Sequence, residues 1–223
     1  MPVTEFAFLE LAVPATPLPD SIRDTLAKAT SVQDAWHAAA FPWLPSSAVD
    51  RAAFWFYQVN DPSWLMTTAK WDSVGAHWEW IRSEENKGIM NHLAKEGVII
   101  PESSVLFHVG GEIFDGTINV KLQESPVISV ERLFVPPSQR PWFETKFMEV
   151  KGILETYASP DLVRFGWRGD VEGGPEEFVL VCGWESVERH LRFAEMGEYA
   201  RYDEIHRVLE RRDLKHYGRI SLE

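Results

Sequence analysis

Hydrophobic and polar positions alternate in short runs that occur in the same order twice along the chain. "FAFLELAVP" (residues 6–14) and "VISVERLFVP" (127–136) are typical of strands, and each ends at a proline, which cannot donate to a sheet ladder. An amphipathic helical pattern follows each run, at about residues 18–39 and 138–158. The matching order indicates an internal repeat with a period of about half the chain.

The next segments of both halves predict a β-hairpin that leads into a second helix. "RAAFWFYQV" and "LVRFGWRGDV" are rich in aromatic residues, and the turn-forming "NDPS" and "EGGPE" follow them. The returning strands "WLMTTAKW" and "EFVLVCGW" run into "WDSVGAHW" (71–78) and "WESVERHL" (184–191), which share W-[DE]-S-V-x-x-H. We expect Ser73 and Ser186 to cap helices that carry His77 and His190 one turn further on. Further helix is expected to about Lys95 and Arg212.

Both halves close on a strand that holds a histidine, His108 in "VLFHVGGEI" and His216 in "LKHYGRISL". Residues 1–118 and 119–223 therefore each predict the order β-α-β-β-α-β, the ferredoxin-like arrangement with helices on one face of a four-stranded antiparallel sheet. The segment 115–126 joins them. Each half leaves one sheet face uncovered. The predicted fold class is α+β, with two tandem ferredoxin-like halves that form a pseudo-dimeric α+β barrel within one chain.

Composition narrows the class of protein. The 223 residues are 45% apolar and 25% charged, which is typical of a soluble globular protein of one or two domains. The net charge of −12 makes nucleic acid and anionic membranes poor partners. No apolar run approaches the ~18 residues of a membrane span, and "MPVTEFAFLE" does not resemble a signal peptide, so the expected location is cytoplasmic.

The single cysteine, Cys182, excludes an internal disulfide and a metal cluster of several cysteines. Its apolar surroundings, "FVLVCGW", predict a small buried hydrophobe in preference to a reactive thiol. The motifs G-x-G-x-x-G after a strand, the Walker loop, H-E-x-x-H and G-x-S-x-G are all absent from the sequence. The sequence therefore gives no support to a nicotinamide-dependent enzyme, a nucleoside triphosphatase, a zinc protease or a serine hydrolase. No cofactor or metal is expected.

The repeated W-[DE]-S-V-x-x-H signature in a ferredoxin-like order resembles the dimeric α+β barrel superfamily, and within it the antibiotic-biosynthesis-monooxygenase-like domains. The resemblance covers nearly the whole chain as two tandem copies. It implies that one chain supplies both sheets of a barrel that usually forms between two chains, and it leaves a further homodimer open. Members include cofactor-independent oxygenases of aromatic polyketides, polyketide cyclases, lactone isomerases, haem enzymes such as chlorite dismutases, and stress-responsive proteins. Fold alone cannot choose among these activities.

The duplicated histidines His77 and His190 have two interpretations. In the first turn of a helix the positive end of the dipole opposes protonation, so each imidazole is expected to be neutral and able to act as a general base. Alternatively, each histidine ties its helix to the preceding strand through a hydrogen bond, and the duplication favours such a structural role. Trp71 and Trp184 are expected to wedge between sheet and helix, where they could also wall a pocket.

The histidines of the last strands form a second matched pair. Strand alternation places His108 on one face with Leu106, and Phe107 on the other. If the helix-covered face is strictly apolar, His108 and, by the same logic, His216 face the barrel interior. There they could act in catalysis or hydrogen-bond between the halves.

The second strand of each half also alternates. One face carries Phe54, Phe56 and Gln58, matched by Arg164, Gly166 and Arg168, and the other carries Trp55 and Tyr57, matched by Phe165 and Trp167. The set with polar members is expected to line the barrel. Arg164 could there stabilise an enolate or phenolate, or it could pair with Glu10 or Glu131 of the opposing sheet.

Seven of the ten tryptophans lie between residues 36 and 80. This asymmetry suggests that the first half holds a cavity for an aromatic or polycyclic ligand, although ordinary core packing explains aromatic residues equally well. Residues 40–53, which have no counterpart in the second half, are a candidate lid.

The function predicted from these features is a cofactor-independent enzyme that acts on a hydrophobic polyketide, terpenoid or aromatic metabolite. His108 or His77 would abstract a proton, Arg164 or Tyr57 would steady the anion, and oxygenation, cyclisation, isomerisation or elimination would follow. Further predicted substrate contacts are Phe54, Phe56, Gln58, Trp71, Trp78, His216, Arg168 and His190. The alternatives are a non-enzymatic ligand-binding or stress-response barrel and, more remotely, a haem-dependent enzyme that uses a single histidine as ligand.

Overall fold

The computed structural model describes the whole chain except residues 115–121, 160–161, 171–172 and 223. The predicted joining segment 115–126 lies largely outside the described residues, apart from its last five. The chain divides into two compact units, residues 1–117 with 219–223, and residues 118–218.

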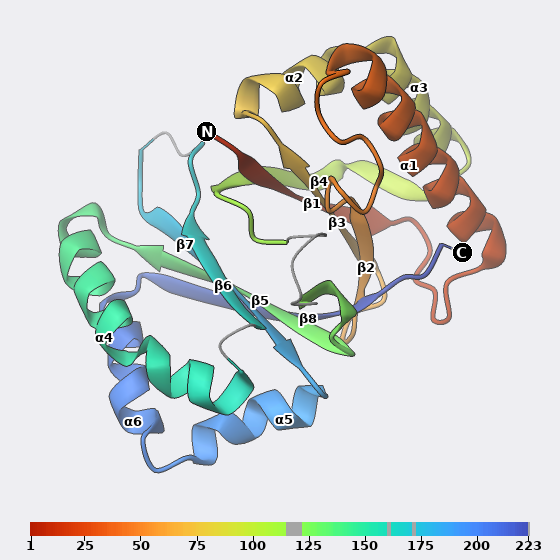
Figure 1. Cartoon of the computed structure of the whole chain (residues 1–223). Coiled ribbons are helices and arrows are strands. Elements are labelled where there is room, and N and C mark those ends of the chain that lie inside the picture. Colours follow the sequence, from red (N-terminus) through yellow and green to blue (C-terminus); the bar gives the residue numbers. More distant parts are fainter. Residues whose placement is uncertain (115–121, 160–161, 171–172, 223) are drawn as a thin grey trace. The chain divides into compact units, whose positions relative to one another are not determined.

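The first unit has the ferredoxin-like order. Its elements are β1 (Val3–Leu11), α1 (Asp20–Ala40), β2 (Phe54–Gln58), β3 (Trp64–Trp71), α2 (Val74–Arg82), α3 (Glu84–Lys95) and β4 (Ile99–Gly110). The antiparallel strands lie in the order β4-β1-β3-β2, and the three helices cover one face of this sheet (Figure 1). The second predicted helix of this half is thus two helices, which meet at Ser83 and end where expected, at Lys95.

The second unit repeats the order with shorter helices. Its elements are β5 (Val127–Val135), α4 (Arg140–Ala158), β6 (Val163–Trp167), β7 (Glu176–Trp184), α5 (Val187–Leu191), α6 (Tyr199–Tyr202) and β8 (Arg211–Arg219). The strand order is β8-β5-β7-β6, again antiparallel. The helix predicted to continue to Arg212 is wrong, because short 3-10 turns at Arg192–Glu195 and Asp203–Val208 interrupt it and β8 begins at Arg211.

Strand alternation sorts each sheet into two distinct faces. On the first sheet Leu9 and Trp55 pack under the helices, and the Trp55 indole donates to Thr30 Oγ1 of α1 at 3.0 Å. On the opposite face Phe6 stacks on Phe107 with ring centroids 5.5 Å apart. In the second unit the helix-covered core includes the buried thiol of Cys182, whose pKa burial raises well above its ordinary value, as expected for a small core hydrophobe.

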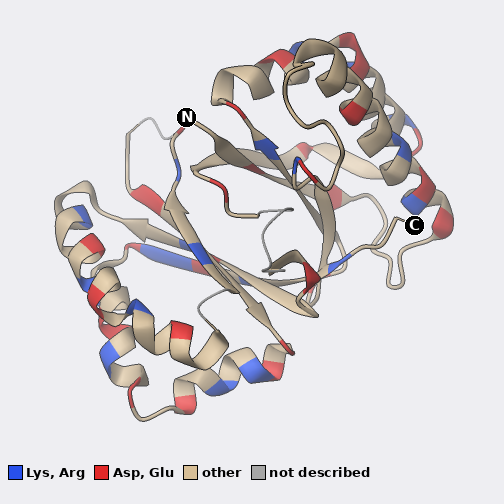
Figure 2. Cartoon of the chain, in the orientation of Figure 1, with Lys and Arg blue, Asp and Glu red and all other residues tan. Residues whose placement is uncertain are grey.

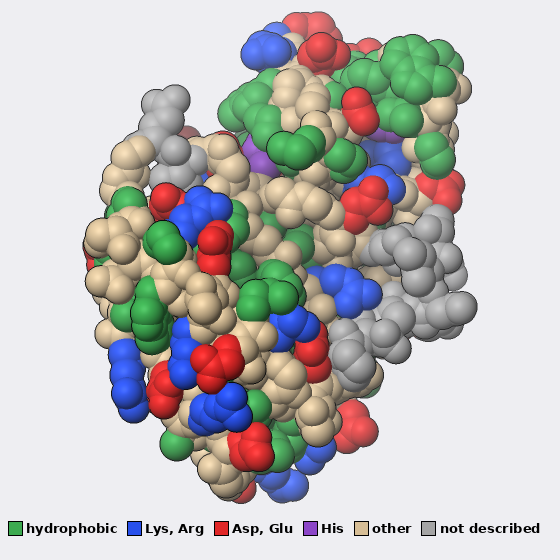
Figure 3. Space-filling model, turned by 60° about the vertical axis from the view of Figure 1, so that its left-hand side comes forward, with side chains coloured by type: hydrophobic (Ala, Val, Ile, Leu, Met, Phe, Trp, Pro, Cys, Tyr) green, Lys and Arg blue, Asp and Glu red, His purple; other side chains and the backbone are tan. Residues whose placement is uncertain are grey.

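Charged residues lie mainly on the helices and loops, and the strands carry fewer of them (Figure 2). On the face that Figure 3 shows, acidic and basic side chains are interspersed. A nucleic-acid-binding surface would present a basic patch or stripe, and this face presents none. Among the described helices, none is both long and apolar enough to cross a membrane.

Both copies of the W-[DE]-S-V-x-x-H signature cap a helix as predicted. Ser73 Oγ accepts from the backbone N–H of Ala76, and Ser186 Oγ accepts from that of Arg189, each at 3.1 Å. The serine side chain satisfies one of the N–H groups that the first turn of a helix leaves unpaired.

We expect Ser73→Ala to lower the free energy of unfolding by about 1 kcal/mol, because the Ala76 N–H loses its acceptor. Chemical unfolding followed by circular dichroism measures the change. Ser73→Asn keeps a side-chain acceptor and should restore most of the loss, so equal destabilisation by both variants would contradict the capping role.

Candidate functional site

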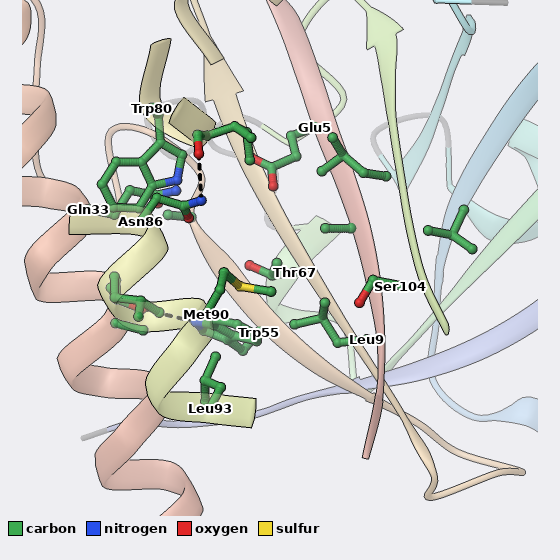
Figure 4. Close-up of a pocket in the computed structure, with 18 residues that line it drawn as sticks. Glu5, Leu9, Gln33, Trp55, Thr67, Trp80, Asn86, Met90, Leu93 and Ser104 are labelled. Carbon is green, nitrogen blue, oxygen red and sulfur yellow. Dashed lines mark hydrogen bonds between the residues drawn. The ribbon is translucent and has the colours of Figure 1, made fainter. Parts of the chain in front are cut away.

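The first unit holds a cavity of about 260 Å³ between the sheet and its three helices. Most of its wall is apolar and includes Leu9, Trp55, Trp80 and Met90. Figure 4 shows Glu5, Thr67 and Ser104 on the sheet side of this space and Trp80, Asn86 and Met90 on the helix side. Polar groups on the wall come from two helices, α1 and α3, and from three strands; they belong to Glu5, Thr30, Gln33, Thr67, Asn86 and Ser104.

Among the described residues that line the cavity, Glu5 alone has an ionisable side chain. It lies on β1 with 5% of its surface exposed, and its Oε2 accepts a hydrogen bond from Trp71 Nε1 at 2.7 Å. Burial raises the pKa of Glu5 from 4.5 to about 7, although the Trp71 hydrogen bond and the charges of His108 and Arg51 act in the opposite direction. A carboxyl group with this pKa exchanges a proton near neutral pH, which suits a general base.

Two histidines continue from Glu5 into the protein. His77 Nε2 lies 3.2 Å from Glu5 Oε2, and His77 Nδ1 lies 2.6 Å from His108 Nε2. The His77 ring stacks on Trp71 with centroids 4.6 Å apart, which fixes its orientation. His77 thus contacts Glu5 through one ring nitrogen and is hydrogen-bonded to His108 through the other.

Local sequence and strand register bring these residues together. The Ser73 cap starts α2 and so places His77 in its first turn, directly after Trp71 ends β3. The register of β1 with β4 pairs Glu5 with His108, so both side chains point to the same face. That face is the one that the helices cover.

The prediction that His108 and His216 face away from the helices is wrong. His108 bonds to His77 of α2, and His216 Nε2 lies 2.8 Å from Nδ1 of His190 on α5. The prediction assumed that a covered face is strictly apolar, but a polar chain can be buried there when its members satisfy one another.

The second unit repeats this arrangement without the acid. Trp184 stacks on His190 with centroids 4.3 Å apart, and its Nε1 donates to Ser129 Oγ, which takes the place that Glu5 has in the first unit. Burial lowers the pKa of His190 to about 3. A structural role for the duplicated histidine thus has direct support, although the hydrogen bond runs to the last strand of the repeat and not to the preceding one.

The predicted contacts on β2 divide between the two sheet faces. Phe54, Phe56 and Gln58 lie on the face opposite the helices, and Phe56 packs near Phe114. Trp55 points under the helices and lines the cavity, whereas Tyr57, two residues on, is 37% exposed.

Trp78 lies on the outside of α2. Its side chain is 40% exposed, and its ring centroid lies 6.4 Å from those of His77 and His108. It therefore borders the histidine pair on the side away from the cavity wall formed by Trp80.

Arg164 and Arg168 lie on the helix-free face of the second sheet. Arg168 pairs with Asp170 and Glu177, and Arg164 Nη1 donates to the carbonyl of Val163. The proposed pairing of Arg164 with Glu131 is wrong, because alternation turns Glu131 to the helix-covered face, where it binds Arg212.

The structure places a different arginine near the cavity. Arg51 is 2% exposed, forms an ion pair with Asp34 and donates to Gln33 Oε1 at 3.1 Å. Its guanidinium carbon lies 6.0 Å from the centre of the Trp71 ring. Arg51 belongs to the predicted lid, residues 40–53, from which Ala53 also reaches the cavity wall.

Sequence reasoning missed Glu5, Arg51 and Ser104. For Glu5 a signal was present, because "VTEFAFLEL" places a carboxylate in the middle of an otherwise apolar strand. Arg51 and Ser104 lie in segments without a clear pattern. Within the described part of the chain, no group of three or more His, Cys, Asp or Glu side chains is arranged to hold a metal ion.

Comparison with known proteins shows likeness in structure only. No family model matches the sequence, and no curated protein matches it. An anthrone oxidase-like protein is similar in structure with a TM-score of 0.62 and 11% identity, over 99% of this chain and 92% of that one. A predicted monooxygenase from Lactobacillus acidophilus NCFM has a TM-score of 0.58 and 13% identity, over 98% of this chain and 93% of that one. A mutant chlorite dismutase from Candidatus Nitrospira defluvii has a TM-score of 0.55 and 11% identity, over 99% of this chain and 92% of that one.

These neighbours span both repeats, and they confirm the predicted α+β class with two tandem ferredoxin-like halves. The chain has a two-repeat ferredoxin-like fold. At such low identity the likeness establishes the fold and leaves the activity to be argued from the site.

The raised pKa of Glu5 predicts how stability depends on pH. A carboxyl group whose pKa is higher in the folded state favours folding when protonated, so this contribution is complete below pH 4.5 and is lost as pH rises to about 7. The loss amounts to roughly 3 kcal/mol at 1.36 kcal/mol per pKa unit.

Glu5→Gln removes this titration, so the stability of the variant relative to the native chain should increase between pH 4.5 and pH 8. Urea unfolding at both pH values measures the difference. A pH-independent difference would contradict a buried Glu5 with a raised pKa.

Proposed function

We propose that the protein is a cofactor-independent oxygenase that acts on an apolar aromatic substrate with a weakly acidic C–H group, bound in the cavity of the first unit. The observation that carries this proposal is Glu5, a carboxyl group with a pKa of about 7 on the wall of an otherwise largely apolar cavity. The likeness to an anthrone oxidase-like protein and to predicted monooxygenases adds support at the level of the fold.

In this mechanism Glu5 accepts the substrate proton. The sequence predicted a histidine as base, but His77 and His108 stand behind Glu5, outside the residues that line the cavity. His77 holds the carboxylate in place and can pass the proton on to His108. Water competes little in a cavity walled by Trp55, Trp80 and Leu93.

Deprotonation leaves negative charge on an oxygen conjugated to the reacting carbon. Ser104 Oγ lines the cavity and is buried without a hydrogen-bond partner among the described residues, so it can donate to this oxygen. Gln33 has its Oε1 held by Arg51, which leaves its amide N–H groups for the cavity. These groups take the role that the sequence assigned to Arg164 or Tyr57.

The carbanion then reacts with dioxygen, which is the oxidant. Carbon donates two electrons and forms a C–O bond, and the peroxide takes up the proton that Glu5 removed. Loss of water from this hydroperoxide cleaves the O–O bond and gives a ketone. One CH₂ group and one O₂ thus become one C=O group and one H₂O. Cyclisation, isomerisation or elimination would share the first step and consume no oxygen.

A haem-dependent reaction has no support from the histidines of this site. The ring nitrogens that join His77 to His108 and His190 to His216 are engaged within each pair.

The pH dependence of turnover tests the role of Glu5. With an anthrone substrate, we expect kcat/KM for oxygen consumption to rise with pH and level off above about 7, because only the carboxylate accepts a proton. Glu5→Gln should lower kcat/KM at least ~100-fold. Glu10→Gln, on the same strand but outside the cavity, is the matched control. Retention of turnover by Glu5→Gln would refute the mechanism, and binding without turnover in the native chain would favour a non-enzymatic ligand-binding protein.

The repeat offers a matched pair of variants for the histidine chain. We expect His77→Asn to lower kcat by roughly 10-fold or more and to shift the pH profile, because the carboxylate of Glu5 loses a partner. The equivalent His190→Asn in the second unit disturbs the same kind of Trp–His–His stack but should leave turnover unchanged. Equal effects of both variants on kcat would show that the histidines act only on stability.

A further inference from the structure

A wide groove lies on the other side of the cavity wall in the first unit. It has a volume of about 620 Å³ and runs between α1, residues 48–49, β2 and the C-terminal residues 219–222. These last residues run beside β2, where the Ile220 N–H donates to the carbonyl of Trp55 at 2.8 Å (Figure 1).

The groove and the cavity share part of their walls. Thr30, Ala53 and Trp55 line both spaces. The Trp55 indole is held between them by its hydrogen bond to Thr30 Oγ1. Two of these three side chains are small, so the Trp55 indole is the main side chain that separates the groove from the cavity.

The groove carries one cation that is positioned for an anion. Arg219 lines it, and its guanidinium carbon lies 4.6 Å from the centre of the Phe54 ring, which also lines it. Stacking occupies the flat face of the guanidinium and leaves the N–H groups on its edge available. The acid of the groove, Asp34, is offset by its ion pair with Arg51.

We propose that this groove is a second subsite of the same binding site, which takes the non-reacting, carboxylate-bearing end of an elongated aromatic substrate. The inference rests on the proposed function and adds the substrate class. A cavity of about 260 Å³ is small for a polycyclic ligand, whereas the adjoining groove lies within the usual range of ligand pockets. The reacting ring lies beside Glu5, the chain of the molecule passes Trp55, and the carboxylate meets Arg219.

Two fluorescent probes of equal ring size test the subsite without any turnover. 2-Anthracenecarboxylate carries the charge, and 2-anthracenemethanol has the same rings without it. We expect the carboxylate to bind the native chain more tightly. Arg219→Gln should weaken binding of the carboxylate probe about tenfold or more, because a charged hydrogen bond is lost. Binding of the alcohol probe should stay unchanged. Arg219→Lys should recover part of the loss.

Arg211→Gln is the matched control, because Arg211 is also exposed, lies on the same strand and stacks on a phenylalanine, Phe134. It should affect neither probe. An equal loss for both probes with Arg219→Gln, or no loss for either, would overturn the proposal.

Met90→Trp tests whether groove and cavity hold one ligand, because the larger side chain fills the cavity and leaves the groove intact. We expect Met90→Trp to weaken the binding of both probes. Undiminished binding of the carboxylate would show that the groove is a separate site and would overturn the two-part arrangement. Because Glu5→Gln should abolish turnover but keep the Arg219-dependent preference, failure of the proposed oxygenase and failure of the subsite give different results.

Discussion

The chain of polar contacts that joins Trp71, Glu5, His77 and His108 is the interaction on which the site of the first unit depends. A carboxylate buried between a sheet and its helices is costly unless neighbouring groups compensate it, and here an indole N–H and an imidazole do so at 2.7 Å and 3.2 Å. The compensation is partial, because burial still raises the pKa of Glu5 to about 7. Stability and proton transfer near neutral pH therefore have the same physical origin.

The two repeats separate scaffold from chemistry. Both contain a tryptophan stacked on a histidine that bonds to a second histidine on the last strand, so this motif joins the helix layer to the sheet in each unit. In the first unit the tryptophan indole donates to a carboxylate, Glu5, and in the second it donates to the hydroxyl of Ser129. The first unit also has the larger of the two cavities under the helices. A duplicated structural motif thus becomes a candidate active site through one added acid.

The surroundings of Glu5 point to an apolar substrate with few polar groups. Tryptophans concentrated in residues 36–80 serve three purposes in the structure. Trp71 binds Glu5, Trp80 and Trp55 wall the cavity, and Trp55 also separates it from the outer groove. Ser104 and Gln33 provide donors at defined places on the wall, so the substrate would be oriented by few hydrogen bonds and enclosed mainly by aromatic rings.

The sequence by itself determined the repeat, the order of strands and helices and the two serine caps, because hydrophobic periodicity and capping are local properties of the chain. Its concentration of tryptophans also predicted a cavity in the first half, although core packing explained these residues equally well. Alternation divided β4 into two sets of side chains but could not say which set the helices cover, so His108 was assigned to the wrong face.

Only the tertiary structure decided which distant residues meet. The pairing of Glu5 with His108 comes from the register of β1 with β4, which joins residues more than a hundred positions apart. The burial of Arg51 against α1 is likewise a long-range contact. A pKa depends on burial and neighbouring charge, which exist only after packing, and for this reason the candidate base changed from a histidine to Glu5 once the fold was known.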